Sequence, residues 1–179
     1  KSRLHVRQND RKISQDTENK TAEIREESEE RNDEDFSAYS SAELKDKLSD
    51  CINTKDYRCI ARAALNLAKT GKEEEKRKYR MVAIESLVEL TDCASAMLQI
   101  MLLFKENPDI REIHRAHFLN ARCYLKEKNF RDAKRILSMI ENDAPELKGE
   151  IAKLREEIKK GEEDGKQTKS EGVQDRDSP

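Results

Sequence analysis

The sequence predicts an all-α fold of helical hairpins in tandem, and three observations lead to it. Pro108 and Pro145 each close a helical segment and lie 37 positions apart, and Cys93 lies 36 positions after Tyr57 in the same local context. Between these positions, apolar residues recur at helical spacing. The whole chain has five glycines, three prolines, four phenylalanines and no tryptophan, which argues against a turn-rich β fold. Stacked hairpins bury their core against neighbours and present an extended surface.

The composition indicates that only part of the 179 residues folds around this core. Charged residues make up 41% of the chain and hydrophobic residues 35%, which is too polar for a fully folded domain. We expect residues 1–38 to be a disordered charged arm, basic at its start and acidic from Glu23 to Asp35. Residues 161–179 contain almost no apolar side chain and are predicted to be a disordered tail. The helical repeat domain is therefore predicted to span residues 39–160.

The first predicted hairpin begins at Ser40 or Ser41, because either hydroxyl can cap a helix. A short turn over residues 53–56 separates its two helices, and Gly71 is a helix stop. Each helix has one apolar face. The first face is Leu44, Leu48, Cys51 and Ile52, and the second is Ile60, Ala64, Leu67 and Ala68.

Two further hairpins are predicted from turn residues and apolar periodicity. The second consists of helices over Tyr79–Leu90 and Cys93–Phe104, and Asn107-Pro108 closes it because proline disfavours helical geometry in the preceding residue. The third consists of helices over Ile110–Lys126 and Phe130–Ile140, which a Lys128-Asn129 turn separates. Its closing proline is Pro145.

A seventh helix is predicted to begin near Glu146 and to cap the array. Its apolar residues form one stripe and charged residues cover the rest. Such a one-sided helix covers the last apolar face of a repeat array while presenting charge to solvent. The stripe is Leu147, Ile151, Leu154 and Ile158.

The third hairpin resembles the tetratricopeptide repeat (TPR), best over residues 114–147. The match consists of Ala121-Arg122-Cys123-Tyr124-Leu125, Asn129-Phe130, Ala133, Leu137 and Pro145. The family repeat is a helical hairpin of about 34 residues with small residues where its helices touch and a closing proline. His117 and Asn120 depart from the family pattern, and the first two hairpins match it less well. The resemblance implies a short right-handed solenoid of about three hairpins plus a capping helix.

The same resemblance implies that the first helix of each hairpin lines a groove that binds a partner. Cationic residues then lie beside apolar anchors on the third hairpin, a combination suited to an acidic or carboxylate-bearing peptide. The alternative is that these charges form an ordinary solvated face. The groove residues implied are Lys45, Arg115, Phe118, Arg122, Leu125 and Lys126.

The function predicted is therefore a non-catalytic protein-interaction module or scaffold that binds a protein or acidic peptide. An alternative is a regulatory or assembly subunit whose N-terminal arm carries the binding. A third is an enzyme without a recognisable motif, since no phosphate loop, nucleophile elbow or metalloprotease motif is present. His114 and His117 share a helix face without a third ligand at defined spacing, so no metal or cofactor is expected. Nucleic-acid binding is not expected either, because Glu73 to Glu75 dilute the basic stretch Lys72–Arg80 and aromatic residues are sparse.

The four cysteines bear on the compartment. Cys51 and Cys59 flank the first turn, where two antiparallel helix ends bring them within reach of a disulfide. Cys93 and Cys123 are expected to be separate buried thiols. Unpaired cysteines favour the cytoplasm, and a Cys51–Cys59 bridge would favour a periplasmic or secreted location.

The longest apolar stretch is Cys93–Phe104, which is too short to span a bilayer, so no membrane insertion is expected within this chain. The chain begins at Lys1 without a basic and apolar leader, and we expect it to be a fragment of a longer protein. The sequence leaves the oligomeric state open.

Overall fold

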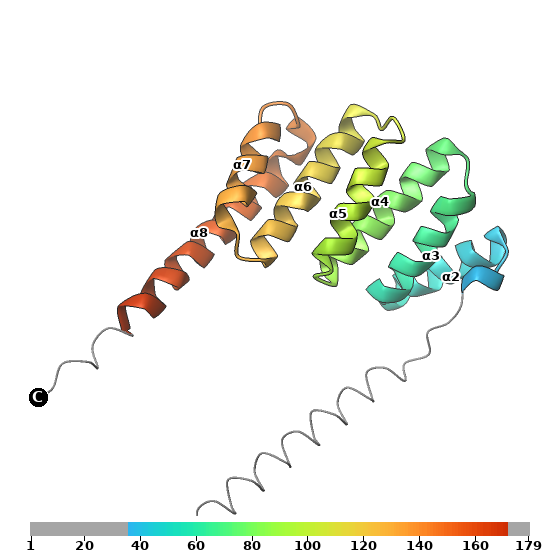
Figure 1. The fold of residues 1–179 in the computed structure, drawn as a ribbon, viewed down its shortest axis with the longest axis horizontal. Helices are drawn as coiled ribbons and strands as arrows, with labels where there is room; N and C mark the ends of the chain where they lie inside the picture. The colour runs from blue at the N-terminus through green and yellow to red at the C-terminus, as the bar shows by residue number, and fades with distance from the viewer. Residues whose placement is uncertain (1–35, 172–179) are drawn as a thin grey trace, which may run out of the picture. The chain divides into compact units, whose positions relative to one another are not determined.

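The computed structural model describes residues 36–171, and this part of the chain is all-α, as predicted (Figure 1). Within it there is no β-strand. Residues 1–35 and 172–179, which carry most of the predicted arm and the end of the predicted tail, lie outside the described residues. In chain order the elements are η1 (Phe36–Ala38), α2 (Ser41–Thr54), α3 (Tyr57–Thr70), α4 (Glu73–Glu89), α5 (Cys93–Phe104), α6 (Ile110–Lys126), α7 (Phe130–Ile140), η2 (Pro145–Leu147) and α8 (Lys148–Glu171).

The same turn joins the two helices of each hairpin. Lys55, Thr91 and Lys128 have φ angles of 56°, 62° and 59°, the left-handed conformation that ends a helix. The next residue is Asp56, Asp92 or Asn129, and its side chain accepts a hydrogen bond from the backbone N–H three residues further on. This bond satisfies one of the free N–H groups at the start of the second helix. This turn recurs at intervals of 36 residues, from Lys55 to Thr91, and 37 residues, from Thr91 to Lys128.

Most helix boundaries follow the sequence signals. The ranges of α5, α6 and α7 are those predicted. The exception is α4, which begins at Glu73 and not near Tyr79. Acidic residues in the first turn suit the positive end of the helix dipole, and Glu74 binds Lys78 one turn later at 2.6 Å. These charges extend the helix through a stretch that has no apolar periodicity.

Small residues allow α3 and α4 to pack closely. Ala63 and Ala64 of α3 and Ala83 of α4 are fully buried and belong to one apolar cluster. Side chains this short let two helices approach each other, which joins the first hairpin to the second. A second cluster fills the space between α4, α5 and α6, and a third lies between α6, α7 and α8. Figure 1 shows these helices following one another in chain order.

The predicted N-terminal arm ends earlier than expected. Phe36 begins the 3-10 helix η1, is only 4% exposed and packs with Leu44 and Leu48 of α2. Arg62 of α3 lies over its ring, 5.4 Å from the centroid. The boundary predicted at residue 38 is therefore wrong by at least these three residues. Burial of one aromatic ring on the first hairpin explains the difference, because a single phenylalanine has no periodicity to reveal it.

We expect deletion of residues 1–38 to lower the free energy of unfolding by about 3 kcal/mol more than deletion of residues 1–35, because only the longer deletion removes the buried Phe36 ring. Urea denaturation of the two truncated chains measures the difference. Phe36→Ala in the intact chain is the control and should reproduce most of it. Equal stabilities of the two truncated chains would show that Phe36 contributes no packing energy.

The predicted C-terminal tail also begins later than expected. The α8 helix continues past Gly161 to Glu171, and its apolar stripe of Leu147, Ile151, Leu154 and Ile158 is buried as predicted. Gly161 faces α7, where a Cβ atom would lie 2.8 Å from the ring of Phe130. The glycine at this position is therefore a close contact between two helices and not the start of a tail.

Alanine at Gly149 and at Gly161 of α8 should have opposite effects. We expect Gly149→Ala to raise the free energy of unfolding by about 0.5 kcal/mol, because no heavy atom lies within 4 Å of its Cβ position and alanine favours a helix. Gly161→Ala should lower it by about 1 kcal/mol, since the Phe130 ring must move. Thermal denaturation compares the two variants. Stabilisation of equal size at both positions would contradict the packing of Gly161 on α7.

Candidate functional site

The predicted groove residues come from the first helices of the first and third hairpins, α2 and α6, and the structure places their cationic groups in contacts between hairpins. Lys45 of α2 lies 3.5 Å from Glu75 of α4. Both side chains are about half exposed, so the pair is worth less than about 1 kcal/mol. Lys45 is thus half of an inter-hairpin pair and not an isolated cation.

Arg115 of α6 connects three helices. Its Nε lies 2.9 Å from Glu85 of α4, and its Nη1 lies 2.7 Å from Glu150 of α8. Its guanidinium also lies 5.5 Å from the ring centroid of Phe118. Burial alone lowers the pKa of Arg115, but the hydrogen bonds to Glu150 and Glu85 outweigh it and raise the pKa. The two carboxylates therefore satisfy a side chain predicted to bind an acidic peptide.

Glu89, at the end of α4, is the hydrogen-bond partner of two further cations of the predicted groove. Arg122 Nη2 lies 2.6 Å from its Oε1 atom, and Lys126 donates a hydrogen bond of 3.3 Å to its backbone carbonyl. The negative end of the α4 dipole adds to the attraction. Arg115, Arg122 and Lys126 therefore all contact α4 from positions along α6.

The two apolar anchors of the predicted groove are wholly or partly removed from the surface. Phe118 is 4% exposed and lies in the cluster with Ile151 and Leu154 of the capping helix. Leu125 is half-buried against the same cluster. The prediction that Phe118 is an exposed anchor is wrong because α8 covers this end of α6. Only the position of α8 in space, which no local pattern specifies, reveals this.

A buried ion pair joins α4 to the loop that follows α5. The guanidinium of Arg80, 8% exposed as a residue, lies 2.6 Å and 3.0 Å from the two carboxylate oxygens of Glu106 and also binds Gln99 of α5. Lys76 lies 3.3 Å from the same carboxylate. In the sequence, Lys76 and Arg80 belong to the basic stretch Lys72–Arg80, which was weighed only for contacts with nucleic acid. The pairing with Glu106 was missed because that residue lies 26 positions from Arg80 in the sequence.

Ion pairs connect the first helices of the hairpins. Lys45–Glu75 links α2 to α4, Arg115–Glu85 and Arg122–Glu89 link α4 to α6, and Arg115–Glu150 links α6 to α8. The cations of the predicted groove are therefore paired within the chain.

The α5 helix exposes an apolar face. Its sequence contains no Asp, Glu, Lys or Arg, and its buried residues form one narrow stripe of Cys93, Ala96, Ile100 and Leu103. Leu98 and Met101 are each 55% exposed and Phe104 is 39% exposed. A helix that is apolar all round is usually buried. In this structure, however, only one face of Cys93–Phe104 is buried.

His114 and His117 of α6 each contact another part of the chain. His114 is 6% exposed, and its Nδ1 lies 3.3 Å from a carboxylate oxygen of Glu146. His117 is half-buried with its ring centroid 5.3 Å from that of Phe104. Burial, and then the neighbouring His114, lowers the pKa of His117. Among the described residues, no three His, Cys, Asp or Glu side chains gather in a way that suits a metal ion.

All four cysteines are paired in disulfides. Cys51 and Cys59 bridge the first turn, with Cα atoms 5.7 Å apart. Cys93 and Cys123 form a second bridge, with Cα atoms 5.4 Å apart, that links the second hairpin to the third. The expectation that Cys93 and Cys123 are separate thiols is wrong. Their pairing follows from the packing of α5 against the end of α6, which brings together residues 30 positions apart in the sequence.

Arg115 should matter more for stability than the other cations of the predicted groove. We expect Arg115→Ala to lower the free energy of unfolding by about 1 kcal/mol, because it breaks contacts to both α4 and α8, and the loss should shrink at high salt. Arg131→Ala, an exposed cation on α7, is the control. Denaturation in low and high salt measures both. If Arg115→Ala is as stable as the unaltered chain, the ion pairs of Arg115 contribute nothing to stability, and the prediction is wrong.

Comparisons with known protein families, with curated proteins and with solved structures find no match to this chain. None of the helices described here is both long enough and apolar enough to cross a membrane.

Proposed function

We propose that this protein is a non-catalytic interaction module, a short TPR-like solenoid that binds a partner protein. The observation that carries the proposal is the exposed apolar face of α5 in a chain of which 41% is charged. An apolar face of this kind on an otherwise polar surface is characteristic of an interaction site. Tandem hairpins supply the rigid support that such a face needs.

This proposal moves the binding surface away from the predicted groove. The cations of that groove neutralise Glu75, Glu85, Glu89 and Glu150 within the chain, so an acidic peptide would have to displace existing partners. Displacing a paired carboxylate gives little net gain. We therefore assign the ion pairs to holding the hairpins together.

Site-specific photo-crosslinking tests the function. A benzophenone side chain is placed at Leu98, Ile52, Lys78 or Met139, each an exposed position on a different helix. Each full-length variant is expressed in the source cells and irradiated. A discrete crosslinked protein at one or more positions supports an interaction module. Absence of any discrete product at all four positions would count against it.

The alternative, binding through the N-terminal arm, remains a proposal with its own sequence support. Residues 23–35 are predominantly acidic, and a segment of this charge suits a basic partner. Deleting residues 1–35 leaves Phe36 and the helical domain intact. Crosslinking that survives this deletion favours the helices, and crosslinking that disappears favours the arm.

The paired cysteines support an oxidising compartment as the place of action. Structural disulfides persist in secreted and periplasmic proteins and are uncommon in the cytosol. The cytoplasm was favoured only because the buried cysteines were expected to be unpaired, and the two bridges remove that reason. Thiol titration of the denatured, unreduced protein from its source cells tests the compartment, with no reactive thiol expected and four contradicting it.

A further inference from the structure

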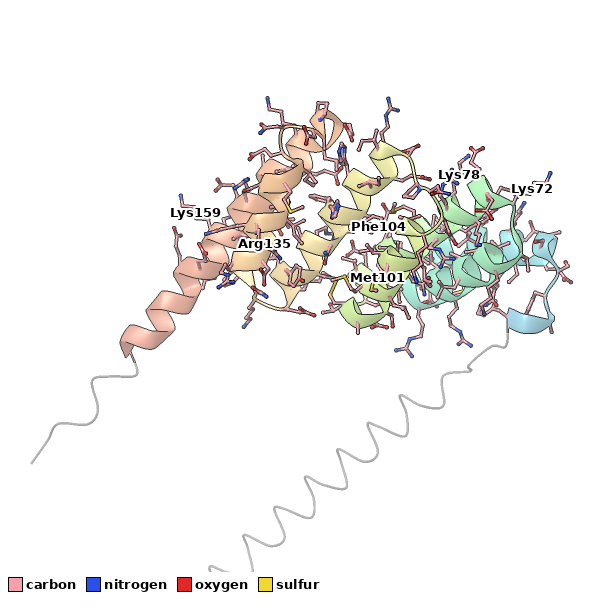
Figure 2. All side chains as sticks on the ribbon, turned by 45° about the horizontal axis from the view of Figure 1, so that its top comes forward. Lys72, Lys78, Met101, Phe104, Arg135 and Lys159 are labelled. Atoms are coloured by element: carbon pink, nitrogen blue, oxygen red, sulfur yellow. A yellow bond between two sulfur atoms is a disulfide. The ribbon has the colours of Figure 1, made fainter. Side chains whose placement is uncertain are left out.

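We propose that α5 docks an amphipathic helix of a partner protein whose flanks are acidic. This inference rests on the interaction function proposed above and specifies its surface and partner. It starts from the pattern of exposure on α5, where Leu98, Met101 and Phe104 follow one another at intervals of three residues. Figure 2 shows Met101 and Phe104 along this helix, with Arg135 on the neighbouring hairpin.

Residues three apart on a helix form a ridge that fits between the side-chain rows of a second helix. The α5 helix packs against α4 and α6 through its opposite face. Within the described part of the chain, Phe104 at the end of the ridge contacts His117 of α6, and Leu98 and Met101 stay more than half exposed. Met97 and Met101 add unbranched side chains that adjust to the shape of what they contact. An exposed apolar ridge of this kind suits a partner helix that docks through its own apolar face.

The charges on the neighbouring hairpins indicate the character of the docked helix. The second helices of these hairpins, α3 and α7, carry six basic residues, namely Arg58, Arg62, Lys69, Arg131, Lys134 and Arg135. Lys134 is paired with Glu162 at 2.6 Å and Arg62 lies over the Phe36 ring. The one acidic residue of α3 and α7 is Asp132, which lies 3.3 Å from Arg135. Lys105 follows Phe104 directly and is exposed. A helix with acidic flanks is attracted to such a surface, and one with basic flanks is repelled.

The same charges argue against a second copy of the chain as the occupant. Two copies meeting through α5 would bring the basic residues of α3 and α7 toward their own equivalents, and juxtaposed like charges oppose association. The slanted ridge also fits a helix better than a flat bilayer surface, because a ridge needs a matching groove. Both alternatives are nevertheless distinct outcomes of the experiment below.

Binding of designed helical peptides to the full chain tests the proposal. The first peptide has 18 residues, with leucines at intervals of three and four along one face and glutamates elsewhere. A second replaces every glutamate with lysine, and a third keeps the composition of the first but scatters the leucines. Fluorescence anisotropy should give at least tenfold tighter binding for the first peptide than for the other two. The affinity should fall with added salt.

Two variants of the protein locate the binding. Met101→Glu should weaken binding of the acidic peptide at least tenfold, because it places a carboxylate in the apolar ridge. Ile52→Glu is the matched control, since Ile52 on α2 is 50% exposed, close to the 55% of Met101, and it should bind like the unaltered chain. Circular dichroism confirms that both variants fold. Equal binding of the acidic and basic peptides, or unaltered binding by Met101→Glu, would overturn the proposal.

Three other results would also overturn it. Sedimentation that shows a dimer lost in Met101→Glu would identify a second copy as the occupant. Flotation with anionic phosphatidylserine vesicles that depends on Met101 would identify a membrane surface. Crosslinking of a partner at Ile52 or Lys78 but not at Leu98 would preserve the interaction function and reject α5 as its surface.

Discussion

Glu106→Ala is expected to lower the free energy of unfolding by about 3 kcal/mol. The carboxylate of Glu106 and the guanidinium of Arg80 are each about 10% exposed and contact each other through two hydrogen bonds. Removing one member of a buried pair leaves the other charge uncompensated, which costs more than the pair itself contributes. Lys76 loses its carboxylate partner at the same time. Urea denaturation measures the loss.

Two further variants define the cause of this loss. Glu74→Ala breaks the exposed Glu74–Lys78 pair on the same helix and should change stability little. Arg80→Met combined with Glu106→Leu removes both buried charges and should recover much of what Glu106→Ala loses. If Glu106→Ala loses no more stability than Glu74→Ala, burial of the Arg80–Glu106 pair does not increase its contribution to stability, and the prediction is wrong.

The same pair should make the free energy of unfolding fall at low pH. Burial raises the pKa of Glu106, but the hydrogen bonds and charges of Arg80 and Lys76 outweigh burial and lower it below its ordinary value. A carboxylate with a lowered pKa in the folded state contributes stability above its unfolded pKa, and this contribution is lost as pH falls through the folded value. Glu106→Gln should therefore lose less stability on acidification than the unaltered chain.

Replacing Cys93 and Cys123 by alanine is the second large effect expected. The bridge closes a loop with a sequence separation of 30, and the loss of this constraint on the unfolded chain costs about 3.7 kcal/mol. The Cys51–Cys59 bridge has a separation of 8, and replacing its cysteines should cost about 2.6 kcal/mol. Denaturation of the two double variants under oxidising conditions compares them.

Reduction of the unaltered chain provides the control for the disulfide prediction. A reducing agent should lower stability in the unaltered chain and should have a smaller effect on each double variant, which retains one bridge. A chain with all four cysteines replaced should not respond. Equal stability of oxidised and reduced protein would contradict the contribution assigned to both bridges.

Much of the helix pattern was predictable because its signals are local. Asp92 and Asn129 cap the helices that follow them, and Pro108 lies in the break between α5 and α6. Such signals act within one turn of the chain, so sequence alone reveals them. The start of α4 was missed because its first two turns are stabilised by charge and have no apolar stripe.

The candidate site was predictable only as a set of residues on one helix. Arg115, Arg122 and Lys126 do lie along α6, but each is held by a residue of another helix between 30 and 37 positions away in the sequence. Cations that bind an external partner and cations that pair with a carboxylate of another hairpin can recur at the same spacing along a helix. The distinction depends on how the hairpins pack.

The sequence by itself therefore determined that this protein is helical, where most of its helices begin and end, and which stripe of α8 is buried. Caps, breakers and apolar periodicity are properties of neighbouring residues, and they act before the helices meet. Only the tertiary structure decided which faces remain exposed. It turned the cations of α6 toward α4, covered Phe118 with α8, paired Cys93 with Cys123 and left the ridge of α5 open, because each of these outcomes depends on contacts between helices.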